Sequence, residues 1–163
     1  MSTCRGYLEA LSVMGAPVGD FYLKLGSPGV PVASEFKRGT PKHCYMNAGR
    51  LAQEHAELAY CEGFAVQPGL IAVHHAWCLT PDGGVVDVTW PFNPGTQYWG
   101  IALSTEFLLE SLMKTEVWGI LGEHVPREML LVHPSTYLHP NFAPPRAQQD
   151  ELFAYIKGLG IQP

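Results

Sequence analysis

The middle of the chain carries short apolar runs that predict a group of β-strands. These runs are rich in valine, tyrosine and tryptophan, and glycine, proline or aspartate bounds each of them. The links between them are short, as in Pro81-Asp82-Gly83-Gly84, which favours antiparallel pairing. The expected strands are 60–66, 70–80, 85–90 and 98–103, with further candidates at 21–25 and 128–133.

Apolar residues at helical spacing predict helices on both sides of these strands. Thr40-Pro41 is typical of a helix start, with threonine as the cap and proline in the first turn. Ser104 or Thr105 can cap a second helix in the same way. The expected helices are 8–14, 41–58, 104–116 and 147–157. Helix, antiparallel sheet and helices in this order predict an α+β fold, formed as a single domain over residues 1–163.

Composition and charge restrict the classes of partner. Hydrophobic residues make up 47% of the chain and charged residues 15%, which is enough apolar material for a core. The formal charge is −5, and the densest basic group is only Lys37, Arg38 and Lys42. Nucleic acid is therefore not an expected partner, although a basic group at a pocket mouth is compatible with this pattern. No apolar run approaches the ~20 residues of a membrane helix, and no export signal is evident, so we expect a cytoplasmic protein.

Four cysteines are candidates for chemistry: Cys4, Cys44, Cys61 and Cys78. None forms a C-x-x-C pair, and reduced thiols are expected in a chain without an export signal. Cys61 and Cys78 lie in predicted strands and are expected to be structural, while Cys4 is expected to be an exposed terminal thiol. Cys44 falls in the first turn of the predicted helix 41–58, where exposed N–H groups and the helix dipole stabilise a thiolate. Cys44 is therefore the candidate nucleophile.

A thiolate that attacks an amide or ester needs a histidine to protonate the leaving group, and a third group to orient that histidine. His75 and Asp87 lie on the two arms of a predicted hairpin. A three-residue loop of Asp82-Gly83-Gly84 pairs 79 with 87 and places Asp87 on the face of His75, whereas a two- or four-residue loop selects His74. The second glycine favours the three-residue loop. The expected triad is Cys44 as nucleophile, His75 as base and Asp87 as orienting acid.

These residues also resemble a known group of proteins. His75-Ala76-Trp77, a glycine-containing turn and Asp87-Val88-Thr89 resemble the His-Ala-Trp…Asp-Pro-Thr segment of the transglutaminase-like superfamily, whose nucleophilic cysteine begins an upstream helix. The resemblance covers residues 40–103. It implies a papain-like α+β core, with the nucleophile helix packed on an antiparallel β-sheet. It also implies cofactor-independent acyl chemistry through a thioester on a peptide or amide substrate, as in a cysteine peptidase, amidase, deamidase, transglutaminase or acyltransferase.

The sequence departs from that pattern in two places. Val88 stands where the superfamily usually has proline, and no glutamine precedes Cys44 to supply an oxyanion donor. The backbone N–H of Cys44, assisted by His43 or Asn47, is the expected substitute.

Three alternatives stay open at this point. The missing glutamine is compatible with a non-catalytic binding or inhibitor module built on the same fold. A zinc site could draw on histidines and cysteines of the same segments, although their spacing offers no tetrahedral pattern and no metal is expected. Its possible ligands are His43, Cys44, His74, His75 and Cys78. The sequence does not separate hydrolysis from acyl transfer.

Overall fold

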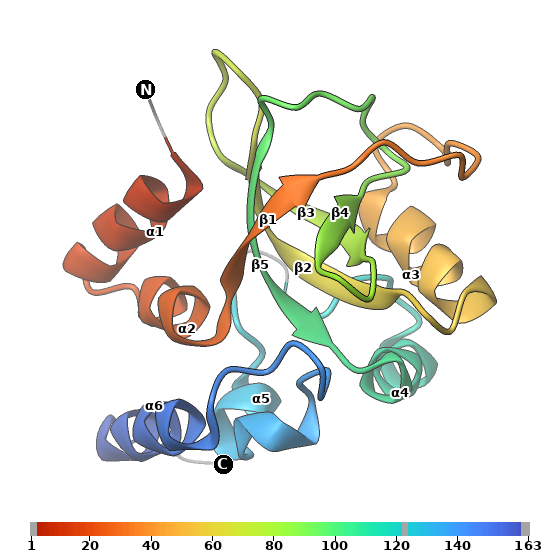
Figure 1. Cartoon of the computed structure of the whole chain (residues 1–163). Coiled ribbons are helices and arrows are strands. Elements are labelled where there is room, and N and C mark those ends of the chain that lie inside the picture. The colour runs from red at the N-terminus through yellow and green to blue at the C-terminus, as the bar shows by residue number, and fades with distance from the viewer. Residues whose placement is uncertain (1–2, 122–123, 161–163) are drawn as a thin grey trace.

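The computed structural model describes residues 3–121 and 124–160 and has a mixed α+β architecture. Within these residues five strands close into a small barrel in the order β1-β4-β3-β2-β5 (Figure 1). β2 pairs antiparallel with both β3 and β5, while β1 runs parallel to β4. The strands are β1 (Ser27–Pro31), β2 (Ala59–Val66), β3 (Val73–Leu79), β4 (Gly84–Val86) and β5 (Gln97–Leu103).

Helices surround the barrel. In Figure 1, α1 and α2 lie on one side of it, and α3 and α4 lie on the other. α6 packs against α2, so segments from the two ends of the described chain meet. None of the helices in the described part of the chain has the length and apolar content that a membrane crossing requires. The helices are α1 (Cys4–Val13), α2 (Pro17–Leu25), α3 (Cys44–Glu54), α4 (Thr105–Thr115), α5 (Arg127–Leu131), the 3-10 helix η1 (Pro134–Thr136) and α6 (Arg146–Gly158).

The predicted strands in the middle of the chain and the helix that follows them are confirmed as elements of the expected type. Strands form where 60–66, 70–80, 85–90 and 98–103 were expected, and they pair antiparallel with their neighbours in the hairpins. The helix expected over 104–116 is α4, and the Ser104 hydroxyl caps it by accepting a hydrogen bond from Phe107 N. The predicted helices 8–14 and 147–157 correspond to α1 and α6.

Two predicted strands are wrong. Residues 21–25 form the second half of α2, which begins at Pro17 and buries Phe21, Tyr22 and Leu25 at helical spacing. Residues 128–133 lie largely in α5, a short helix that buries Met129. The sequence pattern also missed β1, because its Ser-Pro-Gly-Val-Pro run has no strand signature of its own. Tertiary pairing with β4 and β5 makes it a strand.

The predicted helix 41–58 is shorter than expected at both ends. Lys42 adopts a left-handed conformation with φ 66, which interrupts the helix after Thr40-Pro41, so that pair is not the helix start. His43 is the N-cap residue, and α3 begins at Cys44. At the other end His55 is extended. The correction moves Cys44 from within the first turn to the first residue of the helix.

The expected hairpin register is wrong by two residues. Leu79 pairs with Val85 rather than with residue 87, and the loop is Pro81-Asp82-Gly83, with a φ of 87 at Gly83. Because side chains alternate along a strand, a shift of two leaves every side chain on the face that was expected. The predicted strand 85–90 stops at Val86, since the side chain of Asp87 hydrogen-bonds the backbone of the residues that follow it.

Two apolar clusters form the core, one inside the barrel and one between the barrel and the helices. Trp77 is the largest side chain of the inner cluster, and Gly100 on β5 makes room for it. A Cβ at Gly100 would lie 2.5 Å from the indole ring. The inner cluster consists of Ala59, Cys61, Ala65, Trp77, Leu79, Val85, Tyr98 and Ala102.

Candidate active site

Cys44 is the first residue of α3, beside the barrel strand β3. The first helical hydrogen bond runs from Asn47 N to His43 O, so the N–H groups of Cys44 and the next two residues have no acceptor within the helix. Cys44 is buried, with 8% of its surface exposed. Lys42 and Glu116 are the non-glycine residues with positive φ among those described, so the turn before Cys44 is held in an uncommon conformation.

His75 and Asp87 form a buried hydrogen-bonded pair. His75 Nε2 lies 2.7 Å from Asp87 Oδ2, and the two side chains are 3% and 7% exposed. Burial disfavours the charged imidazole, but hydrogen bonds with Asp87 and Cys44, together with their negative charge, raise the pKa of His75 to about 9. For Asp87, burial raises the pKa, yet the bond to His75 and two backbone N–H groups give a net lowering.

The carboxylate of Asp87 accepts four hydrogen bonds. Oδ2 accepts from His75 and, at 3.0 Å, from the Tyr98 hydroxyl. Oδ1 accepts from the backbone N–H of Thr89 at 2.8 Å and of Trp90 at 3.0 Å. Burial and the neighbouring carboxylate raise the pKa of Tyr98, so its hydroxyl keeps its proton as the donor. The orientation of Asp87 is therefore fixed on both oxygens.

Aromatic rings enclose His75. The Trp90 ring lies almost parallel to the imidazole, with centroids 4.1 Å apart and an interplanar angle of 16°. Tyr98 and Trp77 contact it from the barrel interior at 6.5 Å and 6.2 Å between centroids. These rings keep water away from the bond between His75 and Asp87, which strengthens that bond electrostatically.

His74 lies on the opposite face of β3 and does not contact Asp87. Its Nε2 lies 2.6 Å from the Tyr22 hydroxyl, and its Nδ1 hydrogen-bonds the Tyr45 hydroxyl. Burial, followed by repulsion from His75, lowers the pKa of His74 to about 4, so this ring is neutral at ordinary pH. Of the two histidines considered from the sequence, His75 is the one that the structure joins to Asp87.

Comparisons of the chain with protein-family models, with curated proteins and with solved structures found no match. The case for a function therefore depends on the geometry of this site. Over residues 3–121 and 124–160 no group of three or more His, Cys, Asp or Glu side chains is arranged to hold a metal ion. The zinc alternative thus has no ligand set in that part of the chain.

His43 and Asn47, the expected oxyanion residues, lie in different environments. His43 is exposed at the N-cap, and its side chain makes no capping bond. Asn47 is buried, and its Nδ2 donates to Thr40 O at 2.7 Å and to Thr89 Oγ1 at 2.9 Å. Its Oδ1 accepts from Thr40 N at 3.1 Å. Both amide hydrogens of Asn47 are committed, so Asn47 fastens the loop before α3 and is not an oxyanion donor.

The other three cysteines are buried free thiols. The prediction that Cys4 is exposed is wrong, because it is 2% exposed and its thiol donates to Phe64 O at 3.3 Å. Cys61 and Cys78 are buried in strands, as expected. Burial raises the pKa of Cys4 to about 11 and that of Cys78 to about 12. Each of these three thiols is therefore held in its protonated form.

Sequence reasoning missed the supporting roles of the aromatic residues. The sequence pattern predicts no such role for Tyr98 or Trp90, yet one donates to Asp87 and the other covers His75. Tyr22 was placed on a strand, and its contact with His74 depends on the helix α2. The position of Trp90, three residues after Asp87, was the one available signal, since an aspartate often hydrogen-bonds the backbone two or three residues ahead.

Proposed function

We propose that this chain is a cysteine-dependent enzyme of acyl chemistry, with Cys44 as nucleophile, His75 as acid and base, and Asp87 as the orienting carboxylate. One observation carries the proposal. His75 binds Asp87 through Nε2, which leaves Nδ1 free to serve the sulfur of Cys44, whose interaction with the imidazole helps to raise the pKa of His75. This arrangement supplies a nucleophile, a base and an orienting acid in one chain of contacts.

The chemistry follows from these contacts. Cys44 Sγ attacks the carbonyl carbon of an amide or ester, and a C–S bond forms as the C–N or C–O bond breaks. The proton that His75 holds on Nδ1 passes to the departing amine or alcohol. In the second half-reaction His75 takes a proton from water or an incoming amine, which attacks the thioester and releases Cys44. Water gives hydrolysis and an amine gives acyl transfer.

The negative charge that develops on the carbonyl oxygen needs hydrogen-bond donors. The N-terminus of α3 offers the backbone N–H of Cys44 and the positive end of the helix dipole. His43, exposed beside it, is the side chain that could add a second donor. The barrel with the cysteine-bearing helix packed beside β3 is also the arrangement that a papain-like, transglutaminase-like core requires, and we include that core in the proposal.

A test needs no knowledge of the natural substrate. The protein is incubated with p-nitrophenyl acetate, a small activated ester, and intact-mass and peptide mass spectrometry locate the acetyl group. We expect acetylation of Cys44 that hydroxylamine removes, as a thioester requires. The rate should fall by about 100-fold or more in His75→Gln and by a smaller factor in Asp87→Asn.

The control is Cys44→Ala, in which the rapid acetylation should disappear. If the acetyl group is found only on lysines or surface hydroxyls, and equally in Cys44→Ala, the proposed nucleophile is wrong. That result would favour the alternative of a non-catalytic binding or inhibitor module with a buried, inert cysteine.

A further inference from the structure

Positive charge is concentrated on the segment that leads into the nucleophile helix. Residues 32–43 hold three of the chain's ten Lys and Arg but one of its fifteen Asp and Glu, in a protein of formal charge −5. Lys37, Arg38, Lys42 and His43 are exposed. We call residues 37–43 the basic loop.

The basic loop is fixed against the proposed active site. Arg38 Nη2 donates to Thr89 O at 2.8 Å, and Gly39 N donates to Val88 O at 2.8 Å. Asn47 ties Thr40 to Thr89 from the side of α3. The loop is therefore attached to the residues that directly follow Asp87, and its last residue caps the helix that begins with Cys44.

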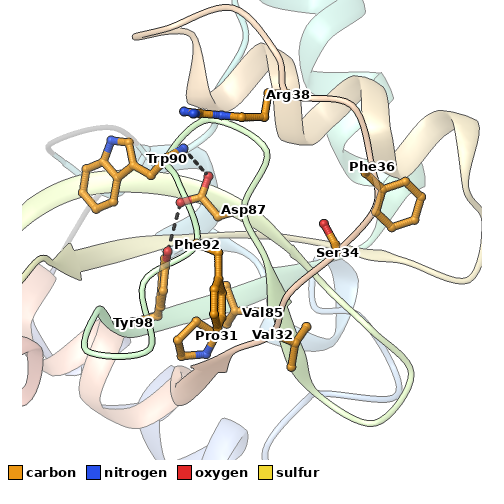
Figure 2. A pocket seen from close by; sticks show the side chains of 10 residues that line it. All are labelled: Pro31, Val32, Ser34, Phe36, Arg38, Val85, Asp87, Trp90, Phe92 and Tyr98. Carbon is orange, nitrogen blue, oxygen red and sulfur yellow. Dashed lines mark hydrogen bonds between the residues drawn. The ribbon is translucent and has the colours of Figure 1, made fainter.

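A small cavity of about 110 Å³ lies beside this attachment. Figure 2 shows Arg38 above Asp87 and Trp90, with Phe36 and Ser34 on the adjoining segment. The remaining walls are largely apolar, from residues such as Val32 and Phe92. Arg38 is the cation of this cavity.

Asp87 also lines this cavity, but its carboxylate is paired with His75 and not with Arg38. Asp87 already accepts four hydrogen bonds, including the one from His75. Arg38 uses Nη2 for its bond to Thr89 O, and a guanidinium carries five N–H groups in a geometry that suits a carboxylate.

From these observations we infer that the basic loop selects an acidic peptide segment, whose carboxylate side chain binds Arg38 beside the acyl group that Cys44 attacks. The inference rests on the proposed function and adds the substrate class. A nucleic acid fits less well. Phosphate backbones are bound by longer series of cations than residues 37–43 supply.

The first test compares the alkylation of Cys44 by iodoacetate, an anion, and by iodoacetamide, its neutral counterpart. The ratio of the iodoacetate rate to the iodoacetamide rate reports the local charge at Cys44. We expect Arg38→Gln with Lys42→Gln to lower that ratio about three-fold at low salt. A variant with Arg38→Lys in place of Arg38→Gln should recover most of the parent ratio. A purely structural role of Arg38 would not give this recovery. The control Lys114→Gln, on α4, should leave the ratio unchanged.

The second test measures binding and does not depend on the chemistry of Cys44. A fluorescent, end-blocked peptide rich in glutamate is titrated into Cys44→Ala, and the same peptide with glutamine in place of glutamate is the comparison. We expect the acidic peptide to bind more tightly and to lose about three-fold in affinity when Arg38→Gln is added.

The outcomes separate the two proposals. If Cys44 reacts no faster than buried Cys61 but the acidic peptide is still preferred, the proposed function fails and only the binding of an acidic segment at Arg38 stands. The inference is overturned if the alkylation ratio is the same in the parent and the double variant, if the two peptides bind equally, or if single-stranded RNA of matched charge displaces the acidic peptide.

Discussion

The imidazole of His75 and the indole of Trp90 stack almost in parallel, with ring centroids 4.1 Å apart. The indole shields the bond from His75 Nε2 to Asp87, so the exchange of the Nε2 proton with water should be slow. We expect a downfield proton resonance of His75 in NMR spectra of the parent protein. In Trp90→Ala this proton should exchange at least about ten-fold faster, whereas Trp90→Phe, which retains a flat ring, should preserve the signal.

His75→Gln, which lacks the ring, assigns that resonance by its disappearance. If the signal of His75 is unchanged in Trp90→Ala, the indole does not shield the pair, and access of water to this bond is controlled elsewhere.

Asp87→Asn should destabilise the protein in a pH-dependent way. The folded-state pKa of His75 is raised to about 9, so its contribution is complete below the ordinary value of 6.5 and is lost as pH rises through about 9. The pKa of Asp87 is lowered, so its contribution is present above 3.8 and is lost as pH falls further. Urea denaturation should therefore show the largest deficit, about 2–4 kcal/mol, between these limits near pH 5–6.

Glu54→Gln, at the exposed C-terminal end of α3, is the matched control and should show little change in the free energy of unfolding. A deficit in Asp87→Asn that is the same at pH 5.5 and pH 10 would contradict an ionic contribution from the His75–Asp87 pair.

Two buried tyrosines should respond oppositely to loss of the hydroxyl. Tyr98→Phe removes a donor to the Asp87 carboxylate and should cost about 1–3 kcal/mol in the free energy of unfolding. It should also raise the pKa of His75, because a less satisfied carboxylate holds the imidazole proton more strongly.

Tyr137→Phe removes a buried hydroxyl that has no partner in the described structure and should be neutral or stabilising. Thermal unfolding and NMR titration of His75 check both; equal losses in the two variants would contradict this account.

Asn47→Ala should free the basic loop. Three hydrogen bonds join Asn47 to Thr40 and Thr89, so we expect a loss of about 2–4 kcal/mol and faster tryptic cleavage after Arg38 or Lys42. His43→Ala, at an exposed cap without a side-chain bond, should change stability by less than about 0.5 kcal/mol. If Asn47→Ala slows acetylation of Cys44 without loosening the loop, Asn47 acts on the reaction directly, contrary to this account.

The sequence predicted four of the five strands of the barrel, and the pairing of His75 with Asp87 for a physical reason. Alternation along a strand survives a register error of two residues, so the loop could be misplaced while Asp87 stayed on the correct face. It could not predict β1, whose conformation is decided by its pairing with β4 and β5. Nor could it place Tyr98 and Asn47, because their roles depend on which hydrogen-bonding groups folding brings within reach.

The most direct test of the account is the pH dependence of iodoacetamide alkylation at Cys44, followed by peptide mass spectrometry. A histidine cation beside the sulfur favours the thiolate, and His75 keeps its proton up to a pKa of about 9. Near neutral pH, Cys44 should react about 100-fold faster in the parent protein than in His75→Gln, and the two rates should converge above about pH 9 as His75 becomes neutral. Identical pH profiles in the two proteins, or a Cys44 as unreactive as buried Cys61 and Cys78, would contradict the account.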